Sequence, residues 1–134
     1  MIQGWDDRGM TTFKKQQGKY GEDLACKYLA GLDYEILDRN YLIRGGEIDI
    51  VAKNGETTVI VEVKLRDGDD YGSAIESITT SKLRALVRTC KYYALEKNIN
   101  GLLRIDLIAI DFINGTPKIQ HIENITEGYN FTIW

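Results

Sequence analysis

The chain has 134 residues, of which 43% are hydrophobic and 28% are charged, and its net charge is −3 at pH 7. This length fits one domain with one hydrophobic core, and the composition excludes the disordered and fibrous classes. A slightly negative chain does not coat nucleic acid through its overall field, so any contact with nucleic acid is expected to be local.

The sequence predicts a cytoplasmic protein that does not contact membranes. No apolar run is long enough for a membrane-spanning helix, and MIQGWDDRGMTTFKK lacks the apolar core and cleavage site of a signal peptide. The single histidine, His121, rules out a multi-histidine zinc site and is expected to be an ordinary strand residue. Cys26 and Cys90 lack metal-ligand spacing and are expected to be buried, reduced thiols.

The N-terminal part of the chain predicts a tail, a helix and a strand. Residues 1–16 show no periodicity and are expected to form a loose tail, with one domain over residues 17–134. From residue 19 to residue 30, apolar side chains recur at helical spacing, and Gly31 stands where a helix C-cap is expected. Residues 34–43 contain short apolar runs with a polar break and predict a first, imperfect strand.

A hairpin gives the strongest local signal. Asn54-Gly55 separates two strand-like segments, GEIDIVAK and ETTVIVEVKL. Asn-Gly between two such segments predicts a two-residue type I′ turn. With that turn, Glu47 faces Glu62, and Asp49 becomes a diagonal neighbour of Glu62.

The second half of the chain predicts a loop, a long helix and two strands. Residues 66–78 are rich in Gly, Asp and Ser, which favours a loop. TTSKLRALVRTCKYYALEK has capping threonines and an apolar stripe at helical spacing. LLRIDLIAIDFI and PKIQHIENI, separated by Asn-Gly-Thr at 114–116, predict two closing strands. The predicted order is therefore αβββαββ.

Alternation along the hairpin strands sorts their side chains into two faces. The apolar face, expected to turn to the main core, carries Ile48, Ile50, Ala52, Val59, Val61, Val63 and Leu65. The other face holds Glu47, Asp49, Glu62 and Lys64. Three acids beside one lysine repel one another, and a hard divalent cation would cancel this repulsion. Lys64 could then hold or help to deprotonate a water that attacks a phosphodiester. A structural ladder of ion pairs is the alternative.

Glu22 adds a fourth acid from the first helix. It precedes Ala25, Cys26 and Leu29 by helical spacings, which places it on the inward stripe. From there it could reach the sheet and complete the site, directly or through a water. The alternative is a glutamate that only favours the positive end of the helix dipole.

Three basic residues are candidates for local contact with nucleic acid. Lys82 is the best placed, because it lies in the first turn of the second helix, where backbone N–H groups favour a phosphate. Arg44 and Arg66 flank the hairpin face at its two ends. The sequence does not rank these two arginines.

The order of the acids and the lysine resembles a known nuclease pattern. A helix-borne Glu22, then Asp49, then Glu62-x-Lys64 is similar to the PD-(D/E)xK superfamily, especially the Holliday junction resolvases. The chain is closer still to the YraN-like family of small bacterial proteins, through GKYGEDLACKYL, LDRNYLIRGGEIDIVAK, VIVEVKLR, YGSAIESITTSKLRAL and LRIDLIAI. This resemblance covers residues 18 to about 125 and places further motif residues at Arg39, Asn40, Arg44, Glu47, Lys82 and Asp106.

The resemblance implies an α/β restriction-endonuclease-like core with a central mixed sheet flanked by helices. It also implies that Glu22, Asp49, Glu62 and Lys64 are catalytic, with Asp49, Glu62 and Glu22 as ligands of Mg²⁺ or Mn²⁺. By analogy with resolvase-like nucleases, the substrate is expected to be DNA, with branched or otherwise structured DNA as a candidate, and the protein a homodimer.

Two other functions remain open. The chain could be a nucleic-acid-binding or adaptor module that keeps the nuclease fold without turnover. It could also bind a protein partner through the aromatic residues Tyr92, Tyr93, Tyr129, Phe131 and Trp134. The intact acids and lysine favour the endonuclease.

Overall fold

The computed structural model describes residues 12–67 and 73–126 and has the predicted αβββαββ order. Its elements are α1 (Thr12–Gly31), β1 (Glu35–Ile43), β2 (Gly46–Asn54), β3 (Thr57–Asp67), a short 3₁₀ helix η1 (Ile75–Ser77), α2 (Thr80–Glu96), β4 (Leu102–Ile113) and β5 (Thr116–Ile122). The first helix begins earlier than expected, at Thr12, because the Lys and Gln residues before Gly18 are good helix formers. The rest of the expected tail, residues 1–11, lies outside the described residues.

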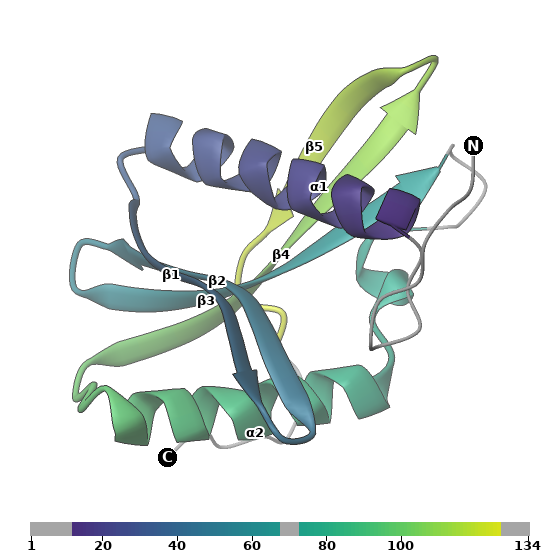
Figure 1. The fold of residues 1–134 in the computed structure, drawn as a ribbon. Helices are drawn as coiled ribbons and strands as arrows, with labels where there is room; N and C mark the ends of the chain where they lie inside the picture. The colour runs from purple at the N-terminus through teal and green to yellow at the C-terminus, as the bar shows by residue number, and fades with distance from the viewer. Residues whose placement is uncertain (1–11, 68–72, 127–134) are drawn as a thin grey trace.

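The five strands form one mixed sheet in the order β1-β2-β3-β4-β5. Neighbouring strands are antiparallel except β3 and β4, which run parallel and are joined by the crossover through α2. The helix α1 covers one face of the sheet and α2 covers the other (Figure 1). This arrangement confirms the expected α/β class and is consistent with a restriction-endonuclease-like core.

Both faces of the hairpin strands are buried, so the expectation that the apolar face alone turns to the core was wrong. On the α1 side, Ile50 and Val61 pack with Leu29 of the helix. On the α2 side, Val51 and Ile60 are fully buried and pack with the second helix. Central strands under helices on both faces are apolar on both faces. The acids therefore lie among buried side chains.

The turn between β2 and β3 differs from the prediction by one residue. Asn54 pairs with Thr57, so the loop consists of Gly55 and Glu56. Of these two, only Gly55 has a positive φ, of 61°. That pattern fits a type II′ turn, in which glycine takes the first loop position, rather than the expected type I′ turn.

The β1–β2 turn is held against α2. Arg88 of α2 donates a hydrogen bond from Nη2 to the carbonyl oxygen of Gly45 over 3.0 Å. A Cβ at Gly46 would lie only 2.0 Å from the Oγ1 of Thr89, so the backbone approaches the helix as closely as only glycine allows. Ile48 accordingly packs on the α2 side, apart from Ile50, against the expectation that the two share a face. The start of β2 thus bends toward α2.

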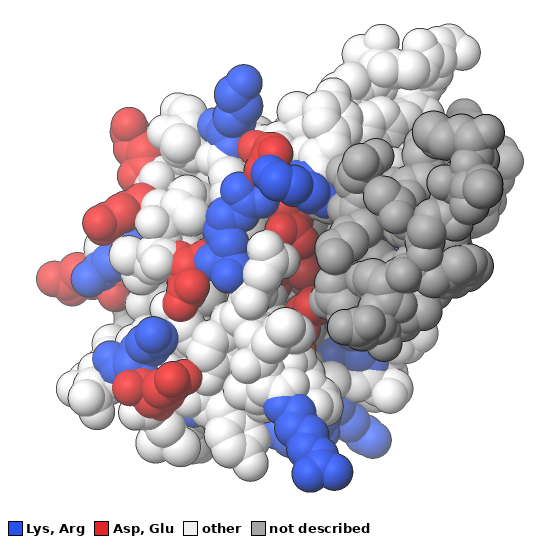
Figure 2. Space-filling model, viewed as in Figure 1, with Lys and Arg blue, Asp and Glu red and all other residues white. Residues whose placement is uncertain are grey.

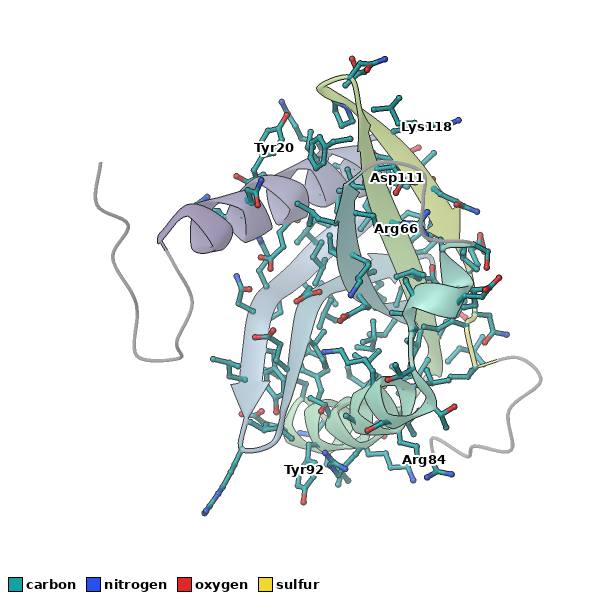
Figure 3. The ribbon with its side chains drawn as sticks, turned by 90° about the vertical axis from the view of Figure 1, so that its right-hand side faces the viewer. Tyr20, Arg66, Arg84, Tyr92, Asp111 and Lys118 are labelled. Atoms are coloured by element: carbon teal, nitrogen blue, oxygen red, sulfur yellow. The ribbon has the colours of Figure 1, made fainter. Side chains whose placement is uncertain are left out.

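Cysteine and aromatic residues divide between the core and the surface. Cys90 is buried as expected, whereas Cys26 is only partly buried, and both are free thiols. Tyr93 belongs to the core, which removes it from a partner-binding surface, while Tyr92 is exposed and points outward from α2 (Figure 3). Tyr129, Phe131 and Trp134 lie outside the described residues.

Neither described helix is long and apolar enough to cross a membrane.

Candidate functional site

Asp49 sits where β2 separates from β3. The ladder between the two strands runs from Asn54↔Thr57 to Ile50↔Val61 and does not continue to Asp49. Beyond it, the Oδ2 atom of Asp49 accepts a hydrogen bond from the backbone N–H of Val63 over 2.8 Å. The side chain therefore takes the place of a ladder bond, which fixes a carboxylate at the fork between the strands.

Asp49 and Glu62 form a buried pair of carboxyl groups at this fork, with residue exposures of 8% and 7%. Burial, and then the charge of Glu62, raise the pKa of Asp49 well above its usual range. Burial also raises the pKa of Glu62, although the charge of Lys82 opposes it. The two groups lie close enough for one to hydrogen-bond the other when protonated. With both ionised, Glu62 Oε1 is buried and has no hydrogen-bond donor among the described residues.

Two further acids act on this pair. The charge of Glu47 raises the pKa of both Asp49 and Glu62. The charge of Asp49 also acts on Glu22 of α1: burial, and then this charge, raise the pKa of Glu22, while Asn40 and Arg39 oppose this rise. The structure therefore gathers the four acids of the prediction around one fork in the sheet.

Glu22 is held by residues of β1 that the strand pattern alone did not single out. Arg39 Nη2 lies 3.5 Å from Glu22 Oε1 and 2.8 Å from Asp23 Oδ1. Asn40 has a left-handed φ of 53°, a conformation that Asn tolerates better than most residues, and its side chain acts to lower the pKa of Glu22. Arg39 Nε is buried without a partner in the described part of the chain. Only the family motif pointed to these two residues.

Lys64 shares a face of β3 with Glu62, because it follows that residue by two positions. Its side chain is partly exposed, in contrast to the buried carboxylate of Glu62. Lys64 therefore lies next to Glu62 on the same face of β3, at a position that solvent can reach.

Of the three basic candidates, only Lys82 joins the acids. Its Nζ lies 3.6 Å from Glu62 Oε2. Arg44 is exposed in the β1–β2 turn. Arg66 forms a two-bond ion pair with Asp111, with distances of 2.8 and 3.0 Å (Figure 3), and lines a separate cavity of about 210 Å³. On the described part of the face in Figure 2, basic and acidic side chains are intermixed, so no broad basic surface is present there.

The residues present fit a cation only in part. No three Asp, Glu, His or Cys side chains of the described ranges are arranged as a ready set of metal ligands. What fits is the adjacent pair Asp49 and Glu62, with one buried carboxylate oxygen that finds no donor in the described part of the chain. Oxygen ligands of this kind suit Mg²⁺, which binds through one or two carboxylates and keeps several waters. A third ligand from Glu22 would require that Arg39 release it.

Comparison with known proteins decides the family. The model of the uncharacterised protein family UPF0102 matches residues 21–110. The chain is 40% identical over 119 residues to a UPF0102 protein of Geobacter metallireducens, which covers 88% of this chain and 98% of that relative. The chain belongs to the UPF0102 family. A UPF0102 protein of Persephonella marina is 43% identical over 109 residues, or 81% of this chain and 90% of the relative.

UPF0102 is the YraN family, so the resemblance drawn from the sequence motifs is confirmed. The UPF0102 match contains every acid of the fork, from Glu22 to Glu62, together with Lys64 and Lys82. His121 lies beyond its end.

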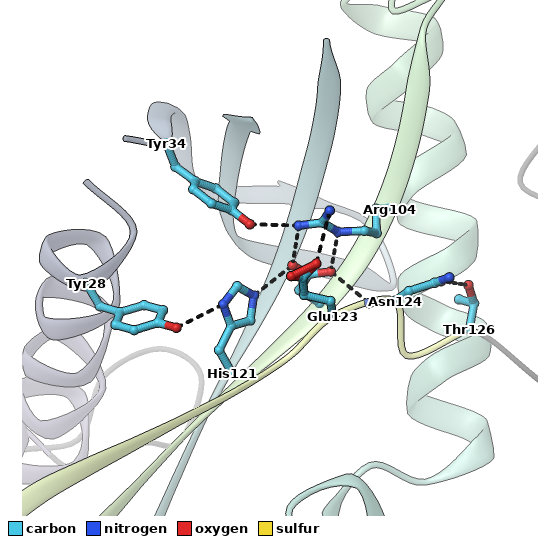
Figure 4. A network of polar contacts seen from close by, with 8 residues as sticks. Tyr28, Tyr34, Arg104, His121, Glu123, Asn124 and Thr126 are labelled. Atoms are coloured by element: carbon cyan, nitrogen blue, oxygen red, sulfur yellow. Dashed lines mark hydrogen bonds and ion pairs between the residues drawn. The ribbon is translucent and has the colours of Figure 1, made fainter. Parts of the chain in front are cut away.

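A second polar network of this UPF0102 protein lies under α1 (Figure 4), and of its members only Asp106 belongs to the family motif. Its centre is Asp106, which is fully buried and accepts hydrogen bonds from Arg104 Nε and Nη2 and from the backbone N–H of Asn124. His121 Nε2 lies 2.8 Å from the same carboxylate, and its Nδ1 lies 3.2 Å from the hydroxyl of Tyr28. His121 is thus a buried network residue rather than an ordinary strand residue.

The Asp106 network has the features of a structural element. Burial alone would raise the pKa of Asp106, but hydrogen bonds from His121, Arg104 and Asn124 outweigh it and hold that pKa below its usual range. Both oxygens of the Asp106 carboxylate already accept hydrogen bonds and are closed to solvent, so neither is available to bind a substrate. The network ties β4 and β5 to α1 through Tyr28.

Proposed function

We propose that the chain is a metal-dependent endonuclease that hydrolyses phosphodiester bonds in DNA, with branched or otherwise structured DNA as its substrate class. The proposal rests on one observation above all. Two adjacent buried carboxyl groups, Asp49 and Glu62, occupy the fork between β2 and β3, and one oxygen of Glu62 has no donor within the described ranges 12–67 and 73–126. Natural proteins seldom leave a buried acceptor unpaired unless a ligand, ion or water satisfies it.

Each residue of the fork has a role in this proposal. Asp49 and Glu62 would hold Mg²⁺ or Mn²⁺, and Glu22 would support them from α1. When bound, such a cation stabilises negative charge on the phosphodiester oxygens. Lys64 lies on the same face of β3 as Glu62, where it can orient the attacking water or take up its proton. Lys82 supplies positive charge at the helix N-terminus for a backbone phosphate.

A cleavage assay tests the proposal. Purified protein is incubated with linear, flapped and four-way-junction DNAs in Mg²⁺, Mn²⁺ or EDTA. We expect cleavage only with a metal, its loss in Asp49→Asn and Glu62→Gln, and a fall of roughly 10²- to 10⁴-fold in Lys64→Met, the range for a residue that moves a proton. Glu123→Gln is the matched control, because Glu123 is exposed and belongs to the other network. Light scattering on the same preparations measures whether the active species is the homodimer expected by analogy with resolvase-like nucleases.

The second candidate is a DNA-binding module without turnover. It is favoured by the engagement of two acids with basic side chains, Glu22 with Arg39 and Glu62 with Lys82, and by the lack of a ready three-ligand set in the described ranges. It predicts binding to the same DNAs that is indifferent to Mg²⁺. Binding without cleavage of any DNA in the panel, in every metal, would replace the first proposal with this one.

A further inference from the structure

Lys82 and a divalent cation would compete for the same carboxylate. The ammonium group of Lys82 lies 3.6 Å from Glu62 Oε2, beside the pair that the proposed function assigns to the metal. Its charge opposes the rise that burial causes in the pKa of Glu62. In the metal-free protein, Lys82 therefore partly neutralises the charge of Glu62, as a bound metal would.

The contact between Lys82 and Glu62 is of a kind that yields easily. A separation of 3.6 Å is longer than a charge-assisted hydrogen bond, and the Lys82 side chain is 42% exposed whereas that of Glu62 is 9% exposed. The ammonium group thus keeps much of its hydration, on a flexible stem of four carbons. Lys82 does not satisfy the buried carboxylate fully, because no described residue donates a hydrogen bond to Glu62 Oε1.

The backbone of Lys82 is firmly placed even though its ammonium group is not. Thr79 caps α2, and its Oγ1 accepts a hydrogen bond from the Lys82 backbone N–H over 3.0 Å. An ammonium group that leaves Glu62 therefore stays within one side-chain length of the fork. Arg39 differs, because it contacts both Glu22 and Asp23 and its planar group has less freedom to leave.

We propose that Lys82 neutralises Glu62 in the metal-free protein and that a bound divalent cation displaces its ammonium group, which then contacts a phosphate of the substrate. The inference rests on the proposed function, because it takes Asp49 and Glu62 as the metal ligands. It makes metal binding and DNA binding cooperative. A cation that binds Asp49 and Glu62 would neutralise their charge and release the Lys82 ammonium group, so that both changes favour binding of a phosphate.

The test uses Ca²⁺ and Mn²⁺ binding measured by calorimetry, and DNA binding measured by fluorescence anisotropy in Ca²⁺ or EDTA. Lys82→Met removes the competing charge and should bind both metals roughly 3- to 10-fold more tightly than the wild type. Arg84→Met is the matched control: Arg84 lies on the same helix, is exposed and points outward (Figure 3). We expect it to leave metal affinity unchanged.

The salt dependence of DNA binding provides the second readout. A lysine that contacts one phosphate contributes about one unit to the slope of log K against log salt. Lys82→Met should therefore lower this slope by about one in Ca²⁺ and change it little in EDTA, where Lys82 is held by Glu62. Equal slope changes in both conditions, or unchanged metal affinity, would overturn the inference while the proposed function stands. If the wild type binds neither metal, both fall.

Discussion

The Oδ2 atom of Asp49 lies 2.8 Å from the backbone nitrogen of Val63, which donates a hydrogen bond to it across the fork between β2 and β3. This bond holds the Asp49 carboxylate beside that of Glu62. By itself it favours the ionised form, yet burial and the charge of Glu62 outweigh it. The fork thus holds the Asp49 carboxyl group in a fixed position in which it ionises less readily than in water.

The first prediction concerns Asp49→Asn in the absence of metal. Since the pKa of Asp49 is raised in the folded protein, the folded state binds more protons than the unfolded state once the pH exceeds the ordinary value of about 4. The free energy of unfolding of the wild type should therefore fall as pH rises through the raised pKa. Asparagine removes this charge and can still accept the hydrogen bond from Val63.

Urea unfolding in EDTA between pH 5 and pH 9 measures this effect. We expect Asp49→Asn to be at least as stable as the wild type at the alkaline end, with the difference growing as pH rises. A difference that stays constant over the whole range would show that the Asp49–Glu62 pair ionises without penalty in the folded protein.

The second prediction concerns stabilisation by metal. A ligand that binds only the folded state stabilises it by about 2.7 kcal/mol at a hundredfold excess over its dissociation constant. Millimolar Mn²⁺ or Mg²⁺ should raise the melting temperature of the wild type, and more so at higher pH, because the cation must displace protons from the acidic pair. Asp49→Asn and Glu62→Gln should lose most of this gain, whereas Glu123→Gln should keep it. An equal gain in all four proteins would place the metal elsewhere.

The sequence predicted which elements form and which acids meet, but not how the hairpin is paired. Alternation placed Glu62 on one face of β3 correctly, because the period of two does not depend on the turn. The sequence does not show whether Gly55 takes the first or the second position of the two-residue loop. In the structure it takes the first, in a type II′ turn, and this changes which residue of β3 faces each residue of β2. The expected facing pairs were therefore wrong: Ile50 faces Val61, and Asp49 lies beyond the last pair of the ladder.

The remaining surprises have a common cause in tertiary contacts. Nothing in a strand pattern shows that β2 leaves β3 beyond Ile50, since this bend depends on the close approach of Gly46 to Thr89 of α2. Nor does the sequence show that Asp106 and His121, on separate strands, meet under α1. Two signals pointed to Asp106 alone: the family motif, and a charged residue within the apolar run LLRIDLIAI, where a buried aspartate needs partners.

The third prediction tests the anchor of the hairpin. Gly46→Ala should destabilise the protein by about 1–3 kcal/mol, because its Cβ would lie 2.0 Å from Thr89 Oγ1 and the hairpin must move away from α2. The metal-induced gain should shrink with it, since Glu47 and Asp49 move with the hairpin. Gly18→Ala is the control: a Cβ there meets nothing within 4 Å, so the helix should gain about 0.5–1 kcal/mol.

The double variant Gly46→Ala with Thr89→Ala separates the steric cause from other effects. Removing the Thr89 hydroxyl and methyl groups opens room for the new Cβ, although it also breaks the hydrogen bond from Thr89 Oγ1 to Ala85. We expect the two changes to be less harmful together than the sum of their separate effects, as a double-mutant cycle of urea unfolding measures. Strict additivity would argue that Gly46 matters through backbone freedom alone.

The last prediction concerns the buried charge of Asp106. Asp106→Asn leaves Arg104 without its buried carboxylate partner and should lower the free energy of unfolding by about 3–5 kcal/mol, the range for breaking a buried ion pair. Glu123→Gln removes the other acid near Arg104, 3.4 Å away, but Glu123 is 57% exposed. It should change stability by less than about 1 kcal/mol.

The pH dependence distinguishes a charge effect from a packing effect at Asp106. Because its pKa is lowered in the folded protein, the stabilisation by the charge is complete above the ordinary carboxyl value and is lost as pH falls through the folded pKa. The gap between the wild type and Asp106→Asn in urea unfolding should therefore be constant near neutral pH and narrow below pH of about 4. A gap that persists unchanged into acid would mean that asparagine disturbs the packing under α1 rather than removing a needed charge.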